Sequence, residues 1–284
     1  MKQAIKYFCV SDIHSFYKPL MDALTRNDFD IENKNHKLIL CGDAFDRGDD
    51  TAKVFEFLKK LKNEDRLIYI TGNHEDLLFD CIKEMTSGKT PGPHHFHNGT
   101  VKTICMLCGE SEWIAYSYNQ SSDTRKSIEE KTKELLEFIK ENCIDYFKLG
   151  NKIFVHSWIP LKYESEIHPL WDANINDLNA EELSIYNQHW ATARWGNPYL
   201  MWKKKLYLDG KCIVFGHWHC SWGHSHIDME TPEYPQKNQP LKWEAAWKPW
   251  IKENSIGIDS CVAYSGKINC IVFDENGDII SNVN

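Results

Sequence analysis

Short apolar runs alternate along the chain with segments in which apolar residues recur every three or four positions. Apolar runs of this length, rich in β-branched and aromatic residues, indicate buried strands. Seven of them are predicted to be strands: Ile5–Val10, Lys37–Cys41, Leu67–Ile70, Ile153–Val155, Lys211–Phe215, Ser255–Ile258 and Ile268–Phe273. Helices are expected where apolar residues share one face, over Thr51–Leu61, Glu75–Met85 and Ser127–Asn142. This alternation predicts an α/β fold with helices covering the sheets.

The remaining stretches contain no internal repeat, flexible linker or low-complexity tract, so residues 1–284 are expected to form a single domain. Ser87–Asn98 combines prolines and glycines with His94, His95 and His97 and is interpreted as a long polar loop. Glu230–Pro249 is rich in proline and tryptophan and is expected to form an irregular but ordered lid or wall.

Composition excludes several classes of function. The chain has 33 Lys and Arg against 41 Asp and Glu, a formal charge of −8, which argues against a broad nucleic-acid-binding face. Its apolar runs are far shorter than the roughly 20 residues of a membrane span, and the N-terminus lacks the apolar stretch of a secretory signal. We therefore expect a cytoplasmic protein without membrane or nucleic-acid partners, whose ten cysteines are reduced.

Metal-ligand residue types follow five of the predicted strands. Ligands of open α/β sheets bind beyond the carboxyl ends of the strands, where these side chains would meet. The five strand-end segments are Ser11–His14, Gly42–Gly48, Thr71–Glu75, His156–Ser157 and Gly216–His219. Each aspartate alone would fit a helix N-cap or a turn, but the repetition at five strand ends indicates a metal site.

The residue types suit a pair of divalent ions. Two such ions hold a bridging hydroxide and clamp the oxygens of an in-line displacement at phosphorus. Asp43, in the middle of the set, is the natural bridging carboxylate. Asp12 and His14 are two positions apart on an extended segment and can bind one ion, and Asn73, His156 and His217 can complete the second. Mixed nitrogen and oxygen ligands favour Mn, with Fe or Zn as alternatives.

The ordered set of motifs resembles the calcineurin-like metallophosphoesterases. It comprises Asp12-x-His14, Gly42-Asp43-x-x-Asp46-Arg47-Gly48, Gly72-Asn73-His74-Glu75, His156 and Gly216-His217. The Asp-Arg-Gly and Asn-His-Glu forms are most similar to the bacterial and phage Ser/Thr phosphoprotein phosphatases. The resemblance implies a four-layer sandwich of two mixed β-sheets flanked by helices.

The resemblance also implies roles for individual residues. Asp12, His14 and Asp43 would bind the first metal, and Asp43, Asn73, His156 and His217 the second. His74 would protonate the leaving group with Asp46 as its charge partner, and Arg47 and Arg194 would bind phosphate oxygens. His219 would be an extra ligand of the first ion, as in broader metallophosphoesterases, or else an ordinary loop histidine. Asn98-Gly99-Thr100 resembles an element that shapes the pocket in bacterial members.

The function expected from these features is metal-dependent hydrolysis of phosphate monoesters by a hydroxide that bridges two metal ions. Phosphoserine and phosphothreonine in proteins are the first expected substrates, and a small phosphoester is the other expected partner. The Gly216-His217-Trp218 form is also similar to symmetrical dinucleoside tetraphosphatases, so a nucleotide hydrolase using the same site is the alternative. An inactive scaffold is disfavoured because the ligand set and His74 are intact.

Overall fold

The computed structural model describes residues 4–116 and 121–281. One sheet of five strands has the order β12-β1-β2-β3-β4. Its strands are β1 (Lys6–Val10), β2 (His36–Cys41), β3 (Leu67–Ile70), β4 (Cys143–Ile144) and β12 (Ile271–Phe273). β1 to β4 run parallel, with Cys9 opposite Ile39, and β12 is antiparallel to β1. Parallel strands place their carboxyl ends along one edge of the sheet.

A second sheet of five strands has the order β10-β11-β9-β6-β5. Its strands are β5 (Phe147–Leu149), β6 (Lys152–Phe154), β9 (Cys212–Phe215), β10 (Trp250–Lys252) and β11 (Ser255–Gly257). The central strands β6, β9 and β11 are parallel, with Ile153 opposite Ile213, and the two outer strands are antiparallel to their neighbours. β7 (Leu161–Lys162) and β8 (Glu166–Ile167) form a separate two-stranded ribbon.

The side chains of each strand alternate between two cores. On β1, Phe8 and Val10 pack into the core beneath the helices, whereas Cys9 faces the second sheet. On β9, Val214 faces the first sheet while Phe215 packs into a third, aromatic core. Because successive side chains of a strand point to opposite faces, the two sheets pack face to face with a further layer outside each. The predicted α/β sandwich of two mixed sheets flanked by helices is confirmed.

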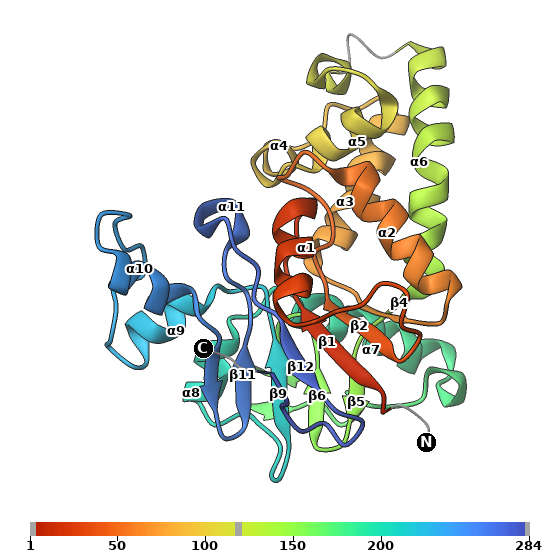
Figure 1. Cartoon of the computed structure of the whole chain (residues 1–284). Coiled ribbons are helices and arrows are strands. Elements are labelled where there is room, and N and C mark those ends of the chain that lie inside the picture. Colours follow the sequence, from red (N-terminus) through yellow and green to blue (C-terminus); the bar gives the residue numbers. More distant parts are fainter. Residues whose placement is uncertain (1–3, 117–120, 282–284) are drawn as a thin grey trace.

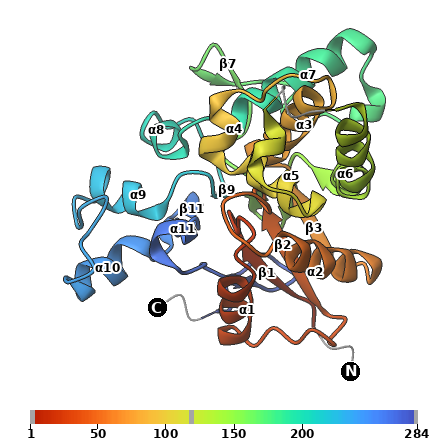
Figure 2. The same cartoon turned by 90° about the horizontal axis from the view of Figure 1, so that it is seen from above.

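Helices of the N-terminal half cover the first sheet, and later helices border the second (Figure 1). The first group is α1 (Tyr17–Arg26), α2 (Thr51–Asn63), α3 (Asn73–Thr86), α4 (Pro93–Asn98), α5 (Thr100–Cys108) and α6 (Ser122–Asn142). The second is α7 (Ala180–Ala193), α8 (Pro198–Lys203), α9 (Cys220–His226) and α10 (Pro240–Trp247). The short α11 (Val262–Ser265) instead packs its buried Val262 into the core of the first sheet. Short 3₁₀ turns in the described part of the chain span Glu112–Ala115 and Ile175–Asp177. α9 and α10 form an arm on the side opposite α6 (Figure 2).

Two segments interpreted as irregular contain helices. Residues 93–98 form α4, which begins with Pro93 at a position where proline is favoured and ends at Gly99 with a φ of +83°. Residues 240–247 form α10, again opened by a proline. The polar loop and the irregular lid or wall predicted for these two segments are therefore wrong in these parts. Both helices are short, and the prolines and glycines at or near their ends are residue types that usually indicate loops.

The ten cysteines carry free thiols, and Cys105 and Cys108 lie on α5 within the core beneath the helices. Within residues 4–116 and 121–281, no helix combines the length and the apolar character that crossing a membrane requires.

Candidate metal centre

The loops that follow β1, β2, β3, β6 and β9 meet at one end of the sandwich. Close packing there requires small residues beside the functional side chains. Gly42, which precedes Asp43, has a φ of +81°, and a Cβ at this position would lie 2.5 Å from Nδ1 of His156. Only glycine adopts this conformation without strain while leaving room for the imidazole. The turn after β2 can therefore bring Asp43 beside a histidine from the other sheet.

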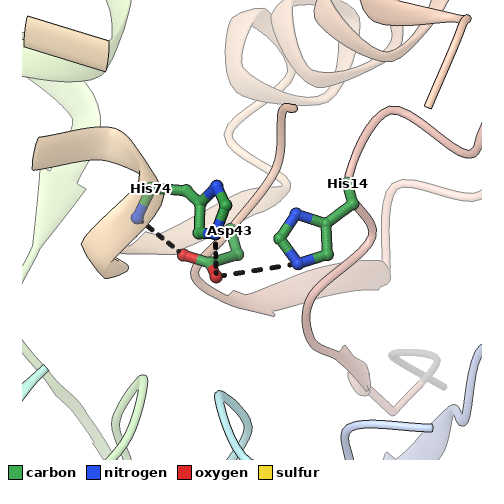
Figure 3. A group of neighbouring side chains, drawn as sticks. All are labelled: His14, Asp43 and His74. Carbon is green, nitrogen blue, oxygen red and sulfur yellow. Dashed lines mark hydrogen bonds and ion pairs between the residues drawn. The ribbon is translucent and has the colours of Figure 1, made fainter. Parts of the chain in front are cut away.

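Asp43 lies between two histidines from neighbouring loops. Its Oδ2 atom is 3.8 Å from Nε2 of His14 and 3.8 Å from Nε2 of His74, as Figure 3 shows. The backbone N–H of His74, in the first turn of α3, donates to Oδ1 of Asp43 over 3.0 Å. All three side chains are buried. The N-terminus of α3 thus fixes the orientation of the carboxylate.

The other oxygen of Asp43 faces a second group. Oδ1 is 3.5 Å from Nε2 of His156, which lies 2.8 Å from Oδ1 of Asn73 and 3.2 Å from Nδ1 of His217. Asp43, His156 and His217 form one cluster of candidate ligand atoms, and His14, Asp43 and His74 form another. The two clusters share Asp43, which is the arrangement that two adjacent cations need.

The histidines are held in the form that a metal requires. Nδ1 of His14 contacts the carbonyl of Phe45 at 2.9 Å, and Nδ1 of His156 contacts the carbonyl of Cys41 at 2.9 Å. A carbonyl only accepts, so each Nδ1 carries the hydrogen and each Nε2 presents its lone pair to Asp43. Burial lowers the pKa of His14 and of His156, and lowers that of His217 to about 3. Neutral imidazoles are the form that binds metal.

Buried carboxylates beside these histidines also favour a cation. Asp12 accepts from the backbone N–H of His217 over 2.9 Å and from the hydroxyl of Ser11. Burial, followed by repulsion from Asp259 and Asp43, raises the pKa of Asp12 well above its ordinary value. Burial likewise raises the pKa of Asp259 to about 6. Aspartates that repel one another in a buried site are a fitting environment for divalent ions, so the residues present suit a metal pair.

Asp259 was not among the residues selected from the sequence. It follows β11 and is 5% exposed, so it occupies the same kind of strand-end position as Asp12 and Asp43. Its Oδ1 atom accepts from the backbone N–H of Cys261 over 2.6 Å. The strand-end rule that selected the other aspartates would have found it, because Ser255–Ile258 was already a predicted strand.

His74 is the histidine with a carboxylate partner and a raised pKa. Its Nδ1 atom is 2.7 Å from Oδ2 of Asp46, which also accepts from the hydroxyl of Thr100 over 2.8 Å. Burial lowers the pKa of His74, but Asp43 and Asp46 outweigh it and leave the pKa above its ordinary value. The exposed side chain of Arg47 brings Nη2 to 3.3 Å from Nε2 of His74. An imidazole of raised pKa and a guanidinium therefore stand together beside Asp43.

The carboxylate of Glu75 accepts hydrogen bonds from several segments that surround the site. Oε2 accepts from the backbone N–H of Asp43 at 3.0 Å and of Gly72 at 2.7 Å. Oε1 accepts from the N–H of Ala44 at 2.9 Å and the hydroxyl of Tyr69 at 2.7 Å. The side chain is 1% exposed. One carboxylate thus joins the loop after β2 to the start of α3, a role that the motif alone did not indicate.

We expect Glu75→Gln to destabilise the protein by about 3 kcal/mol. The amide would place an NH₂ group against backbone N–H donors that now have acceptors. Urea denaturation measures the change, and metal affinity should fall with it because Asp43 loses its support. Glu129→Gln, on an exposed helix position, is the matched control. A Glu75→Gln protein as stable as that control would contradict this role.

Two predicted residues make their contacts with partners outside the two clusters. Arg194 pairs through Nη1 with Asp76 at 2.8 Å and through Nη2 with Asp145 at 2.6 Å, so two carboxylates already balance its charge. The ring nitrogens of His219 contact the hydroxyl of Ser221 at 2.7 Å and that of Tyr234 at 2.9 Å. Phosphate binding by Arg194 and metal ligation by His219 stay predictions.

Backbone strain is concentrated in these loops. Positive φ angles, uncommon outside glycine, occur at Asp12 (50°), His14 (44°), Asp43 (56°) and His217 (65°). Asp46 and Arg47 share this conformation with values of 77° and 58°. Such residues cost about 1–3 kcal/mol each and gather at functional sites, where the surroundings enforce them. This concentration of strain independently supports the strand ends as the candidate functional centre.

Comparison with known proteins agrees with this geometry. A sequence model described as calcineurin-like phosphoesterase matches residues 5–221, which is most of the chain. The chain belongs to the calcineurin-like phosphoesterase family. The predicted family is thus confirmed, and this metallophosphoesterase is a hydrolase of a family that uses divalent metal ions.

Curated relatives of this metallophosphoesterase include nucleotide hydrolases. The symmetrical bis(5'-nucleosyl)-tetraphosphatase of Coxiella burnetii strain RSA 331 is 22% identical over 94% of this chain and 82% of its own length. The asymmetrical bis(5'-nucleosyl)-tetraphosphatase PrpE of Oceanobacillus iheyensis is 30% identical, but over 26% of this chain and 32% of its own length.

Solved structures with a related arrangement include phosphatases of other names. The cold-active protein-tyrosine phosphatase of a psychrophilic Shewanella species matches 96% of this chain and 76% of its own, with 14% identity and a TM-score of 0.49. A protein serine/threonine phosphatase from Saccharomyces cerevisiae matches 76% of this chain and 62% of its own, with 14% identity and a TM-score of 0.36.

Proposed function

We propose that this metallophosphoesterase hydrolyses phosphoric esters or anhydrides at a site for two divalent ions. The observation that carries the proposal is the position of Asp43, whose two carboxylate oxygens face two separate histidine groups at 3.5–3.8 Å. Neutral histidines and mutually repelling buried aspartates around it support the same conclusion.

The proposed ligands divide between the two groups. Asp12, His14 and Asp43 hold the first ion, and Asp43, Asn73, His156 and His217 hold the second. His219 joins the first set only if its ring leaves the hydroxyl of Tyr234. Mixed imidazole, carboxylate and amide ligands favour Mn, with Fe and Zn as alternatives. Bound ions would supply a water of lowered pKa as nucleophile and polarise the phosphoryl oxygens.

The chain's own residues supply the remaining chemistry. His74 donates a proton from Nε2 to the leaving oxygen, while Asp46 holds its Nδ1–H and balances the charge of the imidazolium. Thr100 holds Asp46 in turn. Arg47, exposed and beside His74, binds phosphate oxygens through its planar guanidinium. Arg194 can add to this binding where a phosphate competes with Asp76 and Asp145.

For the substrate, we propose a dinucleoside polyphosphate. The support comes from the curated tetraphosphatase that matches 94% of this chain, together with the Gly216-His217-Trp218 form. Trp195 contributes a half-exposed indole with its ring centroid 6.1 Å from that of His217, where a planar base has a surface to contact. Phosphoserine and phosphothreonine in proteins are the second candidate, favoured by the unbroken Asp46-Arg47-Gly48 and Asn73-His74-Glu75 forms.

A parallel assay on metal-stripped protein, with Mn²⁺ added back, tests both proposals. We expect Mn²⁺ to restore turnover and diadenosine tetraphosphate to be hydrolysed with a higher kcat/KM than a phosphothreonine peptide or an aryl phosphate. A higher kcat/KM for the phosphothreonine peptide would instead indicate a phosphoprotein substrate. Absence of turnover on all three, with two metals bound, would contradict the proposed hydrolysis.

A further inference from the structure

A histidine and two carboxylates meet where α9 ends. Ligand atoms of His224, Asp228 and Glu230 lie within 4.8 Å of one another. His224 stands in the last turn of α9, and Met229, with a φ of +58°, reverses the chain after it. The backbone N–H of Glu230 then donates to the carbonyl of His224 over 2.9 Å. This local turn holds the three side chains together, and none of them is a proposed ligand of the metal pair.

The hydrogen bond of its Nε2 atom fixes which ring nitrogen of His224 faces the carboxylates. Nε2 lies 3.1 Å from the carbonyl of Lys248. A carbonyl only accepts, so Nε2 carries the hydrogen, and in the neutral ring Nδ1 carries the lone pair. Nδ1 lies 3.4 Å from Oδ2 of Asp228. Two acceptors therefore face each other here, which requires a proton or a metal cation between them.

The distance between the two acceptors favours a metal cation. A proton shared by a charged imidazole and a carboxylate gives a separation of about 2.7–2.9 Å. Two ligand atoms about 2.1 Å from a zinc ion, at the tetrahedral angle, lie about 3.4 Å from each other. The observed 3.4 Å between His224 and Asp228 matches the second arrangement. In agreement, Nδ1 of His224 is buried and makes no hydrogen bond within the described part of the chain.

The charges around this histidine also suit a cation. Nζ of Lys252 is 2.6 Å from Oδ1 of Asp228, which leaves Oδ2 turned toward His224. Within residues 4–116 and 121–281, no second lysine or arginine pairs with Asp228 or with Glu230. Glu230 is exposed, so the group is open to solvent on its side. Two carboxylates against one lysine leave a net negative charge beside the lone pair of the imidazole.

We propose that His224, Asp228 and Glu230 bind a divalent cation of the zinc type, separate from the metal pair. One imidazole nitrogen and two carboxylate oxygens are ligands that zinc accepts, and a water molecule completes the fourth position. The carbonyl of Lys248 orients the ring through Nε2, as supporting groups do for metal-binding histidines. The ion would join the end of α9 to the residue that follows α10.

Nuclear magnetic resonance of the ring nitrogens tests the proposal on the metal-stripped full chain, labelled with ¹⁵N in histidine and titrated with Zn²⁺. His224→Gln identifies the signals of His224 and keeps an N–H group that can reach the carbonyl of Lys248. We expect Nδ1 of His224 to shift to the position of a zinc-bound nitrogen while Nε2 keeps its hydrogen. A protonated Nδ1 in the zinc-saturated protein would overturn the proposal, because a simple ion pair with Asp228 would then explain the contact.

Counting bound zinc by mass spectrometry provides the second measurement. His224→Gln should bind one Zn²⁺ fewer than the unaltered chain. Glu230→Gln, at an exposed position that spares the fold, should weaken that ion at least about tenfold, the cost of losing even a supporting residue. His226→Gln is the matched control, because His226 is exposed on the same helix and faces Glu233 instead. The proposal is overturned if His224→Gln and Glu230→Gln bind as much zinc, as tightly, as His226→Gln.

Discussion

Asp43→Asn is expected to remove metal and activity together, with kcat falling about a thousandfold or more. The carboxylate faces both histidine groups, so its neutral amide weakens both ion sites at once. Metal content measured by mass spectrometry and turnover on the preferred substrate are determined on the same preparation. Asparagine keeps the size of the side chain and an oxygen that can accept the N–H of His74.

The control for this experiment comes from the same loop. Asp49→Asn removes an exposed carboxylate that pairs only with Lys102 among the salt bridges of the described residues, and it should retain both metals and full activity. If Asp43→Asn kept two metals and normal turnover, the shared carboxylate could not be the centre of the site. Thermal unfolding of both variants distinguishes loss of a ligand from loss of the fold.

His74→Asn should retain both metals but slow hydrolysis by about 10²–10⁴-fold for substrates with poor leaving groups. The loss follows from removing the proton donor that Asp46 orients over 2.7 Å. An aryl phosphate, whose leaving group needs little protonation, should be affected much less than an alkyl phosphate ester. The comparison of kcat for these two substrates measures this difference.

Another histidine on a nearby helix serves as the comparison for His74. His97→Asn alters a ring whose Nδ1 atom contacts the carbonyl of Pro93 at 2.8 Å, and it should leave both rates unchanged. Equal slowing of the aryl and the alkyl substrate by His74→Asn would assign the residue to metal or phosphate binding. Normal turnover of both would exclude proton donation.

Much of the fold was predictable because buried strands leave a strong local signal. Leu67–Ile70 was predicted with its observed bounds, and Thr51–Leu61 falls within α2. Short helices such as α4 and α10 escaped, since Pro93 and Pro240 resemble loop residues unless their place in a first helical turn is known. The pairing of strands into two sheets depends on contacts between distant segments, which the periodicity of one chain does not contain.

In the candidate site, too, the residues within motifs could be predicted, whereas contacts between distant segments could not. The strand-end residues that the motifs single out, such as Asp43 and His156, do lie together. The motifs do not reveal which side chains these residues contact. Arg194 forms ion pairs with Asp76 and Asp145 from other elements, and His219 contacts the hydroxyl of Tyr234. The four hydrogen bonds of Glu75 are likewise visible only once β3 and the loop after β2 are placed.

Because both sheets contribute residues to one site, neither sheet alone can carry the complete site. Asp12 and the backbone of His217, 205 residues apart, touch directly, and Asn73 meets His156 from the other sheet. A gene fragment ending between the two sheets would encode Asp43 without either histidine of its second group. Such a fragment would be no partial enzyme, so any division of this chain that preserves the site must keep both sheets together.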